Sequence, residues 1–173
     1  MYIDLTLSLY KDIPVFPGDP EVEIKQVHFL EKHGWNMATV SFPTHIATHV
    51  NVPIHMVDNG KTLDDYPLDM FMGNAVLYEK DIPFKKDLGY IFESQNITKE
   101  IVDQLIKTPV KFIALPAKHE FDIEFERVLL EHGQISFENL TNTEKLPKTF
   151  FFAGVPLKIQ KGDGSPVRAY ATI

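Results

Sequence analysis

Polar and apolar residues alternate along three segments at the start of the chain. The pattern runs through YIDLTLSL at 2–9, EVEIKQVH at 21–28 and the stretch at 37–42. A period of two places successive side chains on opposite faces of an extended chain, so each segment is predicted to be a strand. A turn-rich stretch at 14–20 and Gly34 separate the three segments. We therefore expect a meander or hairpin at the start of the fold.

The remainder of the chain mixes helical spacing with short apolar runs. Apolar residues recur at helical spacing over 97–108 and 123–132, and a helix breaker, Pro109 or Gly133, follows each segment. Further strands are predicted at 74–79, 110–115, 149–154, 156–160 and 165–173, with a turn at 162–164 between the last two. These elements predict a mixed α/β fold (α+β) that is richer in strand than in helix.

The segment THIATHVNVPIHM, residues 44–56, concentrates three of the seven histidines. His45, His49 and His55 share one parity, and the opposite parity is almost wholly apolar. Two interpretations follow. The segment is either a half-buried strand whose histidines face solvent, or a metal site, since neutral imidazole is the commonest protein ligand for zinc and related ions.

A metal site requires a bend in this segment. On a straight strand, His45 and His49 would lie about 13 Å apart at roughly 3.3 Å per residue, too far to share one ion at about 2.1 Å from each nitrogen. Pro53 and the β-branched residues beside it disfavour a longer helix. The simplest solution is a bend at Ala47 followed by extended chain.

Composition narrows the class of protein. A chain of 173 residues fits one domain, residues 1–173, and 44% hydrophobic residues suffice for a packed core. The net charge of −7, with scattered basic residues, excludes a nucleic-acid partner. No segment predicts a membrane span or a signal peptide, so a cytoplasmic protein is expected. The absence of cysteine confines any metal site to nitrogen and oxygen ligands.

HIATHVNVPIH, residues 45–55, resembles the HxGTHxDxPxH signature of the cyclase family of metal-dependent hydrolases, which includes the bacterial kynurenine formamidases. The opening segment at 3–20, HGWN at 33–36 and the closing segments at 126–147 and 154–169 are similar to that family as well. The resemblance covers most of the chain except residues 80–120, and typical members are somewhat longer. It implies a swivelling β/β/α domain, assembly as a homodimer or homotetramer, and hydrolysis of a small amide by metal-activated water.

The resemblance also implies roles for individual residues. By matching positions, His45 and His49 are metal ligands, His55 is the general base, and Glu138 falls where the family has a ligand carboxylate. Two further ligand positions differ from the pattern. Asn51 stands where the family has an aspartate that bridges two metals, and Glu126 stands where it has a histidine. We expect a divalent ion, zinc or alternatively manganese, with one ion in place of two.

Other candidate residues carry weaker signals. Trp35, Phe16 and Phe42 are candidates for an aromatic wall around the substrate, although ordinary packing explains them equally well. His119 is close enough in sequence to Glu126 to replace the missing ligand, while a surface position is the alternative. KGDGSPVR, residues 161–168, is interpreted mainly as a turn, in which Arg168 could pair with a carboxylate or a substrate anion.

Two hypotheses of function remain open. The first is an enzyme, a metal-dependent hydrolase that cleaves a small N-formyl or cyclic amide and resembles the arylformamidases of tryptophan catabolism. The second is a catalytically inactive member of the family that binds a small molecule or a protein partner. Asn51 and Glu126 motivate the second hypothesis, because a neutral amide neither bridges two cations well nor offsets their charge.

Overall fold

A computed structural model describes residues 1–173. The strands are β1 (Tyr2–Asp4), β2 (Glu23–His28), β3 (Met37–Ser41), β4 (His49–Asn51), β5 (Met72–Leu77), β6 (Gly89–Ile91), β7 (Phe112–Pro116), β8 (Ser136–Leu140), β9 (Thr149–Ala153), β10 (Gly164–Pro166) and β11 (Tyr170–Thr172). The α-helices are α1 (Leu30–His33), α2 (Lys99–Lys107) and α3 (Ile123–Glu131), and four short 3₁₀ turns accompany them: η1 (Pro53–His55), η2 (Leu63–Asp65), η3 (Leu68–Phe71) and η4 (Thr143–Lys145). The predicted mixed, strand-rich class is confirmed.

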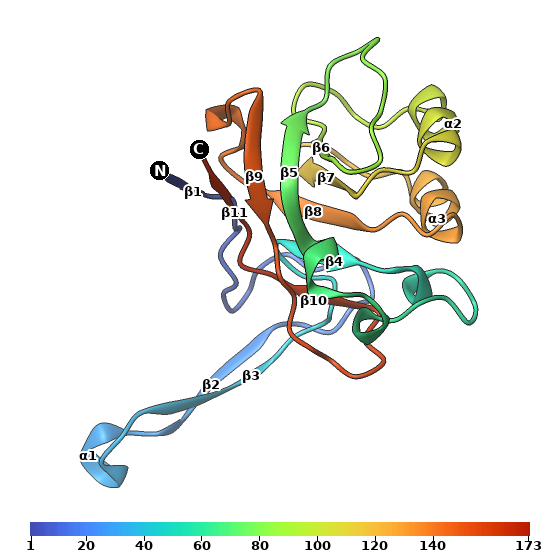
Figure 1. Cartoon of the computed structure of the whole chain (residues 1–173). Helices are drawn as coiled ribbons and strands as arrows, with labels where there is room; N and C mark the ends of the chain where they lie inside the picture. Colours follow the sequence, from blue (N-terminus) through green and yellow to red (C-terminus); the bar gives the residue numbers. More distant parts are fainter.

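Nine strands form one curled sheet in the order β1-β11-β9-β5-β6-β7-β8-β4-β10 (Figure 1). Alternation along β7 shows how the sheet separates two cores. Phe112 and Ala114 belong to a cluster of 18 buried residues on one face, whereas Ile113 and Leu115 belong to a cluster of 12 on the other face, beneath α2 and α3. Burial on both faces explains why β7 is an unbroken apolar run.

The β2–β3 hairpin projects away from this body and carries α1 at its tip (Figure 1). The predicted hairpin is therefore confirmed. Every residue of β3 is exposed, and so are the first four residues of β2. The arm, residues 23–41, thus makes its own two-stranded sheet and buries little against the rest of the chain.

Several predicted boundaries differ from the structure. The strand predicted at 2–9 ends at Asp4. The segment at 156–160 is not a strand, since it forms only an isolated bridge, between Pro156 and Val167. The segment at 165–173 divides into β10 and β11. β10 pairs with β4 and β11 pairs with β9 and β1, toward opposite ends of the strand order. The turn at 162–164 therefore does not join two neighbouring strands.

Two strands have no counterpart in the sequence pattern. β6 is short, and β8 contains Glu138 and Asn139, residue types that are depleted in strands. Helices α2 and α3 lie where helical spacing predicts them. No helix of the structure combines the length and the apolar composition that crossing a bilayer requires.

Candidate metal centre

The histidine segment bends at the predicted position. Ala47 has a φ of 52°, a left-handed conformation, and β4 begins two residues later at His49. Asn139 on β8 is also left-handed, and its side-chain amide donates a hydrogen bond of 3.1 Å to the carbonyl of Ala47. His45 therefore precedes the bend, whereas His49 follows it as the first residue of β4. The interpretation as a straight, solvated histidine face is wrong, because His49 is only 4% exposed.

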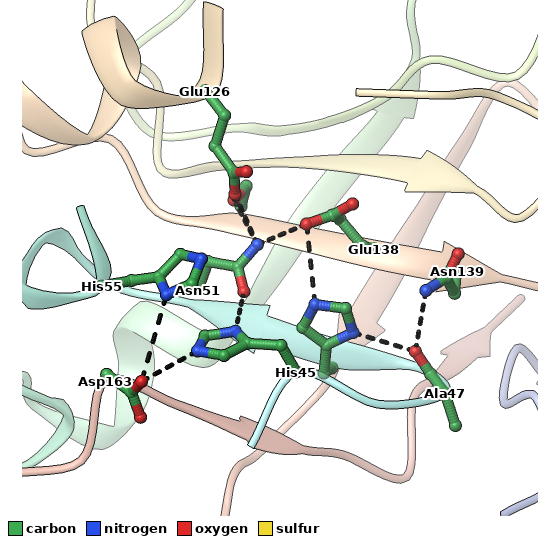
Figure 2. Close-up of polar contacts among 10 residues, drawn as sticks. His45, Ala47, Asn51, His55, Glu126, Glu138, Asn139 and Asp163 are labelled. Atoms are coloured by element: carbon green, nitrogen blue, oxygen red, sulfur yellow. Dashed lines mark hydrogen bonds and ion pairs between the residues drawn. The ribbon is translucent and has the colours of Figure 1, made fainter. Parts of the chain in front are cut away.

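β4 lies between β8 and β10, and this register assembles the site. His49 pairs with Glu138 on β8, and Asn51 pairs with Ser136 on β8 and with Gly164 on β10. Helix α3 contributes Glu126 from above the sheet (Figure 2). The sequence-predicted residues His45, His49, Asn51, His55, Glu126 and Glu138 are therefore brought together.

Asn51 is the centre of the buried part of this group. Its side-chain nitrogen donates hydrogen bonds to both Glu126 and Glu138, and its side-chain oxygen faces Nδ1 of His45 at 2.7 Å (Figure 2). Since the nitrogen must face the two carboxyl groups, the oxygen is the atom that faces His45, and His45 Nδ1 must donate to it. The amide thus joins two carboxyl groups that would otherwise repel each other.

The buried carboxyl groups titrate in opposite directions. Burial, together with the nearby charge of Glu138, raises the pKa of Glu126 to about 8. Burial also opposes ionisation of Glu138, but the interaction with His49, whose Nε2 lies 3.6 Å from Glu138 Oε1, outweighs it and lowers the pKa of Glu138. The same carboxylate outweighs the effect of burial on His49 and raises its pKa. These shifts favour a protonated Glu126 beside a His49–Glu138 ion pair.

A second group of side chains lies at the edge of the site. Asp163 Oδ2 is 3.0 Å from Nε2 of His45 and 4.0 Å from Nδ1 of His55 (Figure 2). The two imidazole rings lie against each other, with centroids 3.7 Å apart. One donor atom from each of the three residues lies within 4.8 Å of the others. All three side chains are partly exposed, so small molecules can reach them.

His55 is electrically neutral in this setting. Burial and electrostatic repulsion from His45 lower the pKa of His55 to about 4, despite the nearby carboxylate of Asp163. A neutral imidazole offers a lone pair, which can accept a proton or bind a metal ion.

Sequence reasoning missed Asp163, which it placed in a turn. The available signal was its position between Gly162 and Gly164. A Cβ atom at Gly164 would lie only 2.4 Å from Cε1 of His45, so the chain beside Asp163 approaches the imidazole closely because residue 164 has no side chain. Ser136, which donates a 3.2 Å hydrogen bond to Glu126, was missed as well.

The three aromatic residues predicted to line the substrate lie in different surroundings. Phe16 is 64% exposed, and Trp35 is 56% exposed at the tip of the arm, where its ring contacts the edge of His28. Phe42 packs beside the small buried cluster that includes Ile46 and Ala47. His119 bonds to the backbone of Glu93, outside the site, and Arg168 pairs with the carboxylate of Asp4.

The residues present fit one divalent ion better than two. A bridging position between two cations requires an anionic ligand, whereas Asn51 is neutral and its nitrogen already occupies the space between the two carboxyl groups. Imidazole nitrogens and a carboxylate with open access remain on the outer side, and they are suitable ligands for one ion of the zinc or manganese type.

Comparisons with known proteins are consistent with this chemistry. A family model described as "Putative cyclase" matches residues 3–134. The kynurenine formamidase of Salinibacter ruber is 25% identical over 209 residues, covering 96% of this chain and 95% of that protein. An uncharacterised protein of Methanocaldococcus jannaschii is 28% identical, with coverage of 99% and 98%. Both alignments are longer than the 173 residues of this chain, so the relatives contain segments that it lacks.

Solved structures share the fold. Isatin hydrolase A from Labrenzia aggregata, bound to benzyl benzoate, superposes with a TM-score of 0.79 at 20% identity, covering 99% of this chain and 93% of that one. An isatin hydrolase bound to the product analogue thioisatinate superposes with a TM-score of 0.80 at 14% identity, with coverage of 99% and 92%. A further neighbour, with a TM-score of 0.76 at 21% identity and coverage of 99% and 96%, is described as a potential metal-dependent hydrolase with cyclase activity.

Proposed function

This chain belongs to the cyclase family, and on that premise we propose that it is a metal-dependent hydrolase of a small amide. The substrate class is an N-formyl or a cyclic amide. Relatives are named as kynurenine formamidases and neighbours in fold as isatin hydrolases, which supports an amide carbonyl beside an aromatic ring. Water adds to the carbonyl carbon, the C–N bond breaks, and the nitrogen leaves with a proton.

The observation that carries the proposal is the convergence of imidazoles and carboxylates at a partly exposed site. When bound there, one divalent ion, zinc or manganese, would polarise the carbonyl and acidify water. Among the predicted ligands, His45, His49 and Glu138 carry nitrogen or oxygen donors, whereas Asn51 and Glu126 are held in hydrogen bonds with each other. Asn51 also fixes the ring of His45 through Nδ1, which orients its other nitrogen.

His55 is unprotonated at neutral pH and has a free lone pair. His55 has a pKa of about 4 and is therefore neutral, so it can accept a proton from water or bind the ion directly. The nearby Asp163 would stabilise positive charge on either imidazole that it contacts. These residues supply the orientation and the proton acceptor that the chemistry requires.

Turnover tests the proposal directly. Purified protein is treated with a chelator, reloaded with zinc or manganese, and assayed on N-formylkynurenine and isatin. We expect activity only in the loaded protein, loss of activity in His45→Ala, and retained activity in His119→Ala, which removes an imidazole outside the site. Activity that survives complete chelation, or no turnover with either ion, contradicts a metal-dependent amide hydrolase.

Asn51 favours a second candidate function. Because its amide satisfies both carboxyl groups without an ion, the chain could keep the fold and bind a small molecule without catalysis. This alternative predicts saturable binding of the two amides, measured by calorimetry, without product formation at any metal concentration. Product formation by the loaded protein excludes it.

The arm supports assembly with a second copy of the chain. Isolated two-stranded hairpins are marginally stable, and this one exposes Ile24, Met37 and Val40 along its strands. We expect a homodimer or homotetramer in light scattering. Val40→Lys should shift the mass toward the monomer, whereas Leu68→Lys, at an exposed apolar position outside the arm, should not. A wild-type monomer at all concentrations contradicts this assembly.

A further inference from the structure

We infer that Asn139 is a positioning residue that fixes the ring of His49 through the carbonyl of Ala47. The inference rests on the proposed function, in which His49 is one of the ligands of the ion, and it deepens that function by naming a residue that acts through a ligand. Asn139 lies outside the histidine signature at 45–55 and follows Glu138 on β8. In this role its amide touches neither the ion nor the substrate.

The backbone of Asn139 brings two adjacent residues of one strand to the same site. Successive side chains of a regular strand point to opposite faces, so those of Glu138 and Asn139 would diverge. Asn139 has a φ of 57°, and this left-handed residue interrupts the alternation. Phe137 and Leu140, three positions apart, belong to the same buried cluster as a result. Glu138 and Asn139 can therefore both reach the segment that carries His49.

Two hydrogen bonds link Asn139 to the bend before β4. Its side-chain amide donates to the carbonyl of Ala47 at 3.1 Å, and its own carbonyl accepts from the hydroxyl of Thr48 at 2.6 Å. The same hydroxyl accepts a 2.7 Å hydrogen bond from the backbone amide of Leu7. Thr48 is buried, so water does not compete for these groups. The backbone and the side chain of Asn139 are thus both held against the bend.

The carbonyl of Ala47 holds the ring of His49 in turn. His49 Nδ1 lies 2.9 Å from this oxygen, and Figure 2 shows the imidazole and the amide of Asn139 meeting at the same atom. A carbonyl oxygen has two lone pairs and cannot donate, so it accepts from both groups, and Nδ1 must carry a hydrogen. Nε2 is then the nitrogen that remains for the ion, and it lies 3.6 Å from Oε1 of Glu138. Metal-binding histidines commonly donate from their second nitrogen in this way.

Two properties of asparagine are used at position 139. Asparagine tolerates the left-handed backbone, which glycine adopts as well. The hydrogen bond to Ala47, in contrast, requires the side-chain amide. Asn139→Gly therefore separates a positioning role from a purely conformational one, because it keeps the backbone preference and removes the donor.

Asn142 provides a matched control on the same stretch of chain. It has a φ of 55°, it is half-buried like Asn139, and its side-chain amide donates to a backbone carbonyl, that of Asp4, at 2.8 Å. Asp4 belongs to β1 and is not part of the polar site. Asn142→Gly thus removes the same kind of hydrogen bond at a left-handed residue that contacts no candidate ligand.

Metal binding by the full-length chain tests the inference. Protein freed of metal by a chelator is titrated with Co²⁺, and calorimetry and visible absorption report the affinity and the ligand field. We expect Asn139→Gly to weaken binding about 10-fold and to change the spectrum, since residues that support ligands contribute roughly 10- to 100-fold. Asn142→Gly should bind Co²⁺ with the affinity and the spectrum of the wild type.

NMR of metal-free, nitrogen-labelled protein gives a second readout that needs no ion. The hydrogen on Nδ1 of His49, assigned by its loss in His49→Gln, should exchange slowly with water in the wild type and in Asn142→Gly. It should exchange faster in Asn139→Gly, because the carbonyl that accepts it is then free to move. Asn139→Asp keeps the shape of the side chain but has no N–H to donate, so it should behave like Asn139→Gly and decides the question if the glycine variant does not fold.

The outcomes separate this inference from the proposed function. If the wild type binds Co²⁺ and Asn139→Gly matches it in affinity, spectrum and exchange, asparagine serves only the backbone conformation, so the inference is wrong and metal-dependent hydrolysis stands. If the wild type binds no ion, the proposed function fails, and the exchange of the His49 hydrogen alone decides the positioning role. Equal effects of Asn139→Gly and Asn142→Gly would show a general loss of stability and would also overturn the inference.

Discussion

The inner and outer parts of the polar site differ in burial and in how far their polar groups are paired. The inner part, defined by Asn51, Glu126, Glu138 and His49, is buried and already has its hydrogen bonds and charges paired. The outer part, defined by His45, His55 and Asp163, is partly exposed, and one donor atom from each side chain lies within 4.8 Å of the others. The inner part therefore stabilises the fold, whereas the outer part has unused capacity to bind a ligand.

The difference rests on one amide. An aspartate at position 51 would place a third carboxyl group between Glu126 and Glu138, where its charge would have no partner unless a cation binds. Asparagine supplies N–H groups there and lets the inner part form without metal. An ion would then bind on the other side of Asn51, where the side-chain oxygen of Asn51 orients the ring of His45.

Asn51→Asp should have the largest effect, because it removes the pairing that distinguishes the inner part. In metal-free protein, the substitution buries an uncompensated charge, and we expect the free energy of unfolding to fall by about 3–5 kcal/mol. Urea denaturation in the presence of a chelator measures the change. Asn59→Asp, at an exposed left-handed position, is the control and should change the stability by less than about 0.5 kcal/mol. Equal stability of Asn51→Asp and the wild type would refute the role of the amide.

Glu126→Gln should change how the stability of the protein depends on pH. The pKa of Glu126 is raised from 4.5 to about 8, so the folded protein keeps a proton that the unfolded chain loses between those values. This group therefore makes the wild type less stable as pH rises from 4.5 to 8, by up to roughly 1.4 kcal/mol per pH unit. Gln has no such proton.

The advantage of Glu126→Gln over the wild type should consequently grow with pH across this window and be absent below it. Chemical denaturation of metal-free protein at pH 4.5, 6 and 8 measures the trend. Glu138→Gln is the matched comparison and should be destabilised at pH 7, because it removes the charge that pairs with His49. A difference between Glu126→Gln and the wild type that does not vary with pH would show that Glu126 is ionised.

Ala47→Gly should have the smallest effect, at the bend that separates the two parts. Alanine in the left-handed region costs about 1–2 kcal/mol, which glycine avoids. Glycine loses a buried methyl group and adds freedom to the unfolded chain, so we expect a net stabilisation of at most about 1 kcal/mol in thermal unfolding. Ala171→Gly, buried in β11, should destabilise the protein instead. Destabilisation by both would show that the bend carries no strain.

Sequence patterns predicted the parts of the molecule that are local. Helices α2 and α3, the hairpin and the bend at Ala47 follow from spacing, breakers and ligand geometry within a few residues. β8 could not be predicted in this way, because Glu138 and Asn139 face a site formed by residues distant in the chain. Asp163 was missed for the same reason. Its importance depends on the pairing of β10 with β4, more than 100 residues earlier, which no local pattern records.

Anomalous diffraction from a crystal soaked with zinc would locate the ion directly. The account predicts one peak beside His45, with the nitrogen of Asn51 still bonded to Glu126 and Glu138. A peak between Glu126 and Glu138, or two peaks on either side of Asn51, would contradict it.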